Sequence, residues 1–190
     1  MSPEDIVNNA LELIGHPTRI GSFFDGSPEA VVARDMWAET RDALLVRTQP
    51  DWAREDVPLE VIKSAPPYYD EQTPWVAGKY PDMPWLYEYA QPEVCLVPLA
   101  LKPRAHTLPI WRPHAMRFRV KTGQDQTYVL LGNDPAPILT CIVHTNNPDI
   151  WYEDFIELMT VTLAKKLERL FAPIPERKRP DANDAGRRSE

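Results

Sequence analysis

The residues of this chain that could take part in catalysis or bind a metal are two cysteines, four histidines and two pairs of carboxylates. The cysteines are Cys95 and Cys141, and the histidines are His16, His106, His114 and His144. None of them has a metal-binding spacing such as H-x-x-x-H or C-x-x-C, so no metal site is expected. A nucleophilic cysteine needs a base and an orienting group beside it. The sequence places neither, and we interpret both thiols as buried side chains.

The paired carboxylates are Asp35 with Glu39 and Glu153 with Glu157. Such pairs could do acid–base work, but a solvated helix face is the simpler interpretation of each. The sequence has no G-x-S-x-G, glycine-rich phosphate loop or H-x-E pattern, and its 7 glycines leave little to build one. We therefore predict neither an enzyme nor a cofactor-binding protein.

The formal net charge is −7. This charge argues against a surface that grips a duplex, because such a surface needs clustered cations to displace the counterions of the phosphates. The longest mostly apolar stretch, residues 94–101, is interrupted by Pro98 and is far below the roughly 20 residues of a membrane helix. No membrane span is expected, and the cysteine usage favours synthesis in a reducing cytoplasm.

Two helices near the start of the chain would position part of this chemistry. Ser2 and Asp5 form a capping box ahead of apolar residues at helical spacing, which predicts a first helix over residues 3–14. Ser27 is the cap of a second helix over residues 28–49.

An acidic stripe is expected on the second helix. Asp35, Glu39 and Asp42 recur at i, i+4 and i+7, so they lie on one side of the helix. The opposite side carries the residues expected in the core, which are Ala33, Met36, Trp37, Thr40 and Leu44.

The remaining chain is divided by proline, of which there are 21. Each proline removes a backbone donor and fixes φ, so residues 51–114 are expected to form a stiff proline-rich insert without central strands. Short helices are expected within it near residues 58–64 and 82–89. Alternating apolar residues then predict a small antiparallel β-meander over residues 115–147, and helical spacing returns in residues 148–172.

The predicted fold class is therefore mainly α. One domain, residues 1–172, contains a helical bundle of residues 1–50 and 148–172, the long proline-rich excursion and the β-meander. Residues 173–190 contain almost no apolar side chains, so we expect a flexible, charged C-terminal arm.

Four stretches of the sequence, taken in order, resemble the tail tubular protein A family of phage head–tail connector adaptors. They are ALELIGHPTRIGSFFDGSPEA, ARDMWAETRDALLVRTQPDWA, WLYEYAQPEVCL and NNPDIWYEDFIELMTVTLAKKLERLF. The last is similar to the D-P-x-x-W-x-x-x-F helix of that family. The chain departs from the family at Val94 and Val97, where an acid and an arginine flank the family's cysteine.

The resemblance implies a viral structural protein of the virion neck, made in the host cytoplasm. It implies a homo-oligomeric ring, commonly dodecameric, between the portal protein and a tail or nozzle protein. Genomic DNA would pass through this ring without specific binding. An acidic wall repels phosphates, so we expect Asp35, Glu39 and Asp42 to line the channel.

Two further sets of contacts are expected of such a ring. Portal binding is expected of the basic residues of the arm, namely Arg177, Lys178, Arg179, Arg187 and Arg188. Contacts with neighbouring subunits or the next ring are expected of aromatic residues in the insert, namely Trp75, Tyr80, Trp85 and Tyr87.

Two alternatives stay open. A stopper or tail-completion protein of the same neck region would be favoured by an exposed plug loop. A small hydrolase from a mobile element would instead use Cys95 or His144, and would lose a measured activity when either is substituted.

Overall fold

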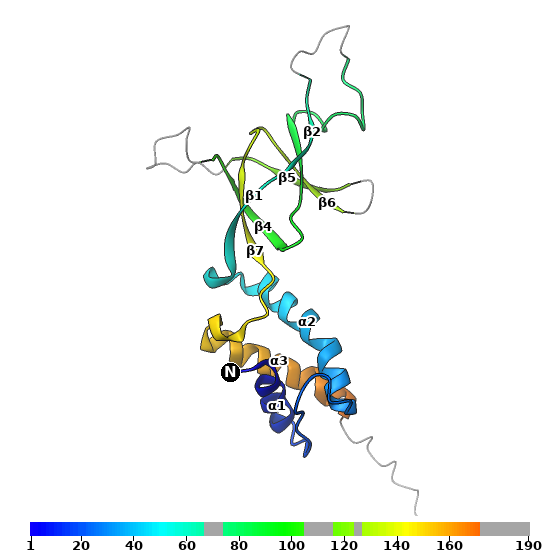
Figure 1. The fold of residues 1–190 in the computed structure, drawn as a ribbon, viewed down its shortest axis with the longest axis vertical. Helices are drawn as coiled ribbons and strands as arrows, with labels where there is room; N and C mark the ends of the chain where they lie inside the picture. Colours follow the sequence, from blue (N-terminus) through cyan, green and yellow to red (C-terminus); the bar gives the residue numbers. More distant parts are fainter. Residues whose placement is uncertain (67–73, 105–115, 124–126, 172–190) are drawn as a thin grey trace, which may run out of the picture.

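The computed structural model describes residues 1–66, 74–104, 116–123 and 127–171. Within these residues the chain forms three α-helices and two antiparallel sheets of three and four strands. The helices gather at one end of an elongated molecule and the sheets at the other (Figure 1). Of the described residues, 38% are in helices and 26% are in strands. The fold is therefore mixed α/β, and the prediction of a mainly α protein is wrong.

The three predicted helices are present. They are α1 (Pro3–Leu13), α2 (Pro28–Thr48) and α3 (Glu153–Phe171). The Oγ of Ser2 accepts from the backbone N–H of Asp5, whose carboxylate accepts from the N–H of Ser2, so the predicted capping box is confirmed. The last helix begins later than expected because Pro148–Ile150 forms a 3₁₀ turn first.

The helices share a core with one of the sheets. Helix α3 packs against both α1 and α2. The buried residues of this core include Ile6 and Leu11 of α1, Leu45 of α2, and Met159 and Leu163 of α3. The same cluster includes Ile142 of a strand. The helical end and the β end are thus joined by continuous apolar packing.

The seven strands form two sheets. The first has the order β1-β7-β4, from β1 (Arg54–Pro58), β7 (Ile138–Val143) and β4 (Cys95–Lys102). The second has the order β2-β3-β6-β5, from β2 (Val61–Ser64), β3 (Tyr87–Ala90), β6 (Tyr128–Gly132) and β5 (Arg119–Thr122). Every strand pair is antiparallel.

The proline-rich insert is where the prediction fails. Strands β1 to β4 all lie within residues 51–114, and β3 is a central strand. The prediction of short helices near residues 58–64 and 82–89 is wrong, since these stretches contain β2 and the start of β3. Proline excludes only certain positions of a strand. Pro58 ends β1, and Pro98 lies on the edge strand β4 beside a register shift.

The prediction of a β-meander over residues 115–147 is half correct. Strands β5 and β6 pair as expected, but β7 leaves them and lies between β1 and β4 in the other sheet. The sequence of β7 is apolar on both faces, with Leu139, Cys141 and Ile142 all buried. A strand of this kind is stable at the centre of a sheet, where both faces are covered.

A second core lies in the β end and includes residues of both sheets. Its buried residues include Tyr89, Leu101, Leu130 and Leu139. The hydroxyl of Tyr89 donates to the carbonyl oxygen of Asp134, and burial raises the pKa of Tyr89 to about 12.

Gly132 of β6 allows the two sheets to approach closely in this core. A Cβ at this position would lie 3.0 Å from Cδ2 of Leu101 and 3.1 Å from the ring of Tyr89. A larger residue would therefore force buried side chains apart.

Candidate functional site

The acidic stripe of α2 is paired with cations. Asp35 and Glu39 are exposed, as expected. The Nε of Arg34 lies 3.5 Å from Asp35, and the Nζ of Lys166 on α3 donates to Glu39 at 3.1 Å. These pairs offset part of the negative charge of the stripe. A channel-lining role for these carboxylates stays a prediction.

Asp42, the third residue of the stripe, is partly buried at the junction of the helical and β ends. The Nε of the buried Arg41 donates to its Oδ1 at 2.7 Å, and Nη2 lies 2.7 Å from the same oxygen. The Nδ1 of His144, which follows β7, is 3.2 Å from Oδ2. Helical periodicity in the sequence could not show that α2 contacts β4 of the three-stranded sheet. Asp42 joins the two ends of the molecule.

The four aromatic residues predicted at an interface are all partly buried. Trp75 and Tyr80 contact each other, with ring centroids 5.6 Å apart. Tyr87 stacks on Tyr89 at 6.3 Å and packs against the second core, so it is part of the fold. The structure thus brings two of the four together, and none of them is fully exposed.

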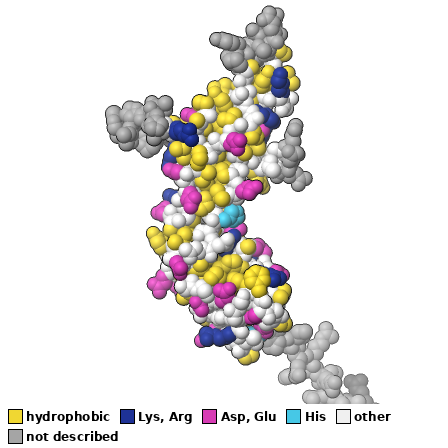
Figure 2. Space-filling model, in the orientation of Figure 1, with side chains coloured by type: hydrophobic (Ala, Val, Ile, Leu, Met, Phe, Trp, Pro, Cys, Tyr) yellow, Lys and Arg dark blue, Asp and Glu magenta, His cyan; other side chains and the backbone are white. Residues whose placement is uncertain are grey.

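Several of the exposed apolar residues that sequence analysis missed lie around the four-stranded sheet. On the two edge strands they are Val61 and Ile62 of β2 and Val120 of β5, and Tyr128 of β6 is exposed as well. The segment before β3 adds Val76, Met83 and Leu86. Figure 2 shows hydrophobic side chains spread over the β end of the molecule. Alternating apolar residues in the sequence predicted β5. Strand β2 was missed because a short helix was expected near residues 58–64.

A buried carboxylate lies within the same sheet. Glu88 of β3 is 3.2 Å from the Nζ of Lys63 on β2 and 3.2 Å from the Nζ of Lys121 on β5. Burial opposes the charge of Lys121, but hydrogen bonds to Asp82 and Glu88 outweigh it, so the pKa of Lys121 is raised. This network links both edges of the sheet, and its charges offset one another.

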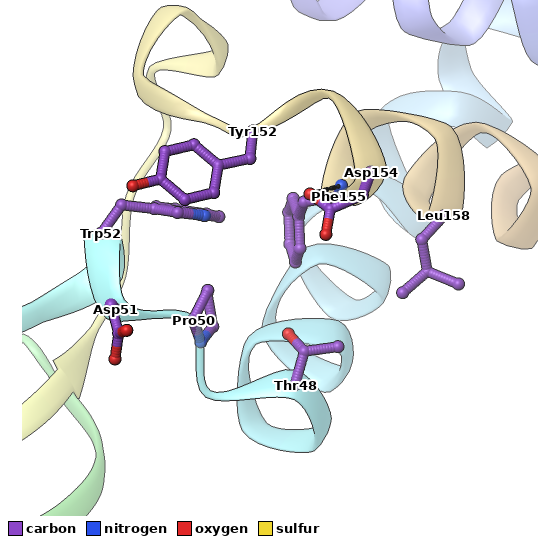
Figure 3. A pocket seen from close by; sticks show the side chains of 8 residues that line it. All are labelled: Thr48, Pro50, Asp51, Trp52, Tyr152, Asp154, Phe155 and Leu158. Atoms are coloured by element: carbon purple, nitrogen blue, oxygen red, sulfur yellow. Dashed lines mark hydrogen bonds between the residues drawn. The ribbon is translucent and has the colours of Figure 1, made fainter.

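An aromatic pocket of about 260 Å³ opens at the junction of α2 and α3 (Figure 3). Trp52, in the 3₁₀ turn Asp51–Ala53 that follows α2, lies beside Tyr152, which precedes α3, and Phe155 faces it edge-on. The Trp52 and Phe155 rings are 5.0 Å apart at 79°. Asp51 and Asp154 also line the pocket. Sequence analysis did not find this pocket, because its two halves are distant in the chain.

The cysteines lie buried in the second core. A hydrogen bond with Cys141, together with burial, raises the pKa of Cys95, which disfavours the thiolate. His16 lies 3.7 Å from Glu29, and His144 pairs with Asp42 as described above. Within the ranges that the structure describes, no three His, Cys, Asp or Glu residues are grouped to hold a metal ion.

Several predicted residues lie outside the described residues. They are His106, His114 and the basic residues of the arm, Arg177, Lys178, Arg179, Arg187 and Arg188. Their predicted roles stay predictions. No helix in the described part of the chain is long and apolar enough to cross a membrane.

No family model matches this sequence, and no curated protein is significantly similar to it.

Proposed function

We propose that this chain is a structural head–tail connector adaptor of a tailed phage. Identical copies form a ring beneath the portal protein that conducts genomic DNA and joins the tail or nozzle protein. The observation that supports this proposal best is the four-stranded sheet, which has apolar side chains exposed on both of its edge strands.

Two different exposed edges suit a ring. Strand β2 is at one edge of the sheet with Ile62, and β5 is at the other with Val120. An exposed edge strand with apolar side chains is an aggregation hazard in an isolated subunit. A contact between the β2 side of one copy and the β5 side of the next is heterologous, and a repeated heterologous contact closes into a ring when its rotation permits.

The charge of the chain suits a conduit for DNA. The net charge is −7, and the exposed carboxylates of α2 are balanced by single cations rather than by a basic patch. Such a surface does not collect phosphates, so DNA slides without being held. In this proposal the basic arm, residues 173–190, binds the portal.

The test is electron microscopy and native mass spectrometry of the full chain mixed with the portal protein of the same phage. We expect rings on the portal, with the C-terminal arm in contact with it. A chain that stays monomeric and does not bind the portal would refute the proposal.

A matched pair of variants tests the role of the sheet edge. Ile62 on β2 is 48% exposed and Val46 on α2 is 45% exposed, so lysine at either position should leave folding intact. We expect Ile62→Lys to prevent ring formation and Val46→Lys to preserve it. Rings that persist in Ile62→Lys would contradict the edge contact.

A further inference from the structure

We propose that the pocket formed by Trp52, Tyr152 and Phe155 binds a basic side chain, and that its occupant in the free subunit is the chain's own C-terminal segment, residues 172–190. The inference deepens the proposed function, on which it rests in one respect: the docked segment would be the arm that later binds the portal. The binding itself requires neither a ring nor a portal.

The shape of the pocket suits a single side chain. Its volume, about 260 Å³, is below the roughly 300–1,000 Å³ of typical small-molecule pockets. Tyr152 is 61% exposed, and its ring centroid is 6.4 Å from that of Trp52. Planar aromatic walls accept the flat face of a guanidinium and the methylene stem of a lysine or arginine.

The charge of the pocket selects a cation. Asp51 and Asp154 line it, and Asp51 already holds one guanidinium, with Nη1 of Arg54 at 2.9 Å. In the described ranges no lysine or arginine lies within ion-pair distance of Asp154. A carboxylate beside aromatic rings is a favourable site for arginine, which can stack and form a charge-assisted hydrogen bond at once.

The C-terminal segment has the matching charge. It holds the only run of three consecutive basic residues in the chain, Arg177, Lys178 and Arg179. The chain as a whole is acidic, with 28 Asp and Glu against 21 Lys and Arg. Glu176 and Asp181 flank this run, but its three adjacent cations make it locally positive and suited to a pocket lined by carboxylates.

The segment is also long enough to reach the pocket of its own chain. Helix α3 ends at Phe171, so Asp154 lies about 26 Å back along its axis at 1.5 Å per residue. Pro173 and Pro175 favour an extended backbone. Eight residues, 172–179, then span about 25 Å at 3.1 Å per residue, and the side chain covers the rest.

The test is disulfide trapping in the full chain. Thr48→Cys, at an exposed lining residue that leaves all three aromatic walls in place, is combined with Lys178→Cys, which leaves Arg177 and Arg179 in place, or with Ser189→Cys as the control on the same segment. The two native cysteines are buried and do not compete. We expect Thr48→Cys/Lys178→Cys to form an intramolecular disulfide roughly tenfold faster than the control, because docking raises the effective concentration of the thiols. Adding Asp154→Asn should abolish most of this difference.

Each result decides the matter. Equal rates for the two pairs would show that the segment does not dock, and a product of dimer mass at the fast rate would assign the pocket to a neighbouring copy. Either result overturns the inference. Neither affects the head–tail proposal, because no portal or ring enters the assay. Conversely, fast intramolecular trapping in a chain that never binds a portal would support the pocket and refute the adaptor function.

Discussion

Replacing Asp42 with alanine tests whether the junction between the helical and β ends depends on its ion pairs. Asp42 is the partner of Arg41, whose side chain is only 7% exposed, and its Oδ2 also lies 3.2 Å from Nδ1 of His144, which follows β7. Asp42→Ala would leave the guanidinium of Arg41 in a largely dry site without its carboxylate. An uncompensated buried charge is costly.

The expected loss follows from the burial of the pair. Removing one partner of a fully buried pair costs about 3–5 kcal/mol, and the side chain of Asp42 is 26% exposed, which places the loss near the lower end. We expect a loss of about 3 kcal/mol, equivalent to about 6–12 °C in Tm for a chain of this size. Asp35→Ala is the matched control, because its pair with Arg34 is exposed and such pairs contribute about 0–1 kcal/mol.

The assay is urea and thermal unfolding followed by circular dichroism and tryptophan fluorescence. The double variant Arg41→Leu/Asp42→Ala should recover much of the loss, since it removes the buried charge as well. If Asp42→Ala is no less stable than Asp35→Ala, or if the double variant is as unstable as the sum of its single variants, the junction does not depend on this ion pair.

Three other predictions concern the folded state. Gly132→Ala should destabilise the second core by about 1–3 kcal/mol in urea unfolding, because its methyl group meets Leu101 and Tyr89. Tyr89→Phe should lose about 1 kcal/mol, the value of its hydrogen bond to the Asp134 carbonyl, with an unchanged far-ultraviolet spectrum. Hydrogen bonds from Ser27 and nearby backbone lower the pKa of Asp25 to about 2. Its folded-state pKa is thus below the unfolded value, so its contribution is present above about pH 4 and is lost as the pH falls toward 2. Asp25→Asn should flatten that part of the stability curve.

The helices could be predicted because their signals are local. Ser2 and Ser27 are caps whose partners lie within three residues, and the apolar spacing of α3 identifies its buried face. The junction could not be predicted in this way. Asp42 has the same spacing as Asp35 and Glu39, but it differs from them in its burial and in its contacts with the buried Arg41 and with His144.

The strands of the insert were missed because the many prolines were taken to exclude strands from the whole of residues 51–114. A proline disrupts a strand only at certain positions. Tyr87–Ala90 contains no proline and pairs on both sides. Pro98 is tolerated on β4 because that strand is at the edge of its sheet. The spacing between prolines was therefore more informative than their number.

The corrected fold changes where subunit contacts are sought. In a mainly helical adaptor, the aromatic residues of an irregular insert would be the natural contacts, yet Tyr87 packs into the second core. Among the exposed apolar residues, Ile62 and Val120 lie on opposite edges of one sheet. The two edge strands differ in sequence, and a contact between unlike surfaces is what a cyclic assembly larger than a dimer requires. The sheet, of which sequence analysis predicted only β5 and β6, thus has the two unlike edges that the ring proposal needs.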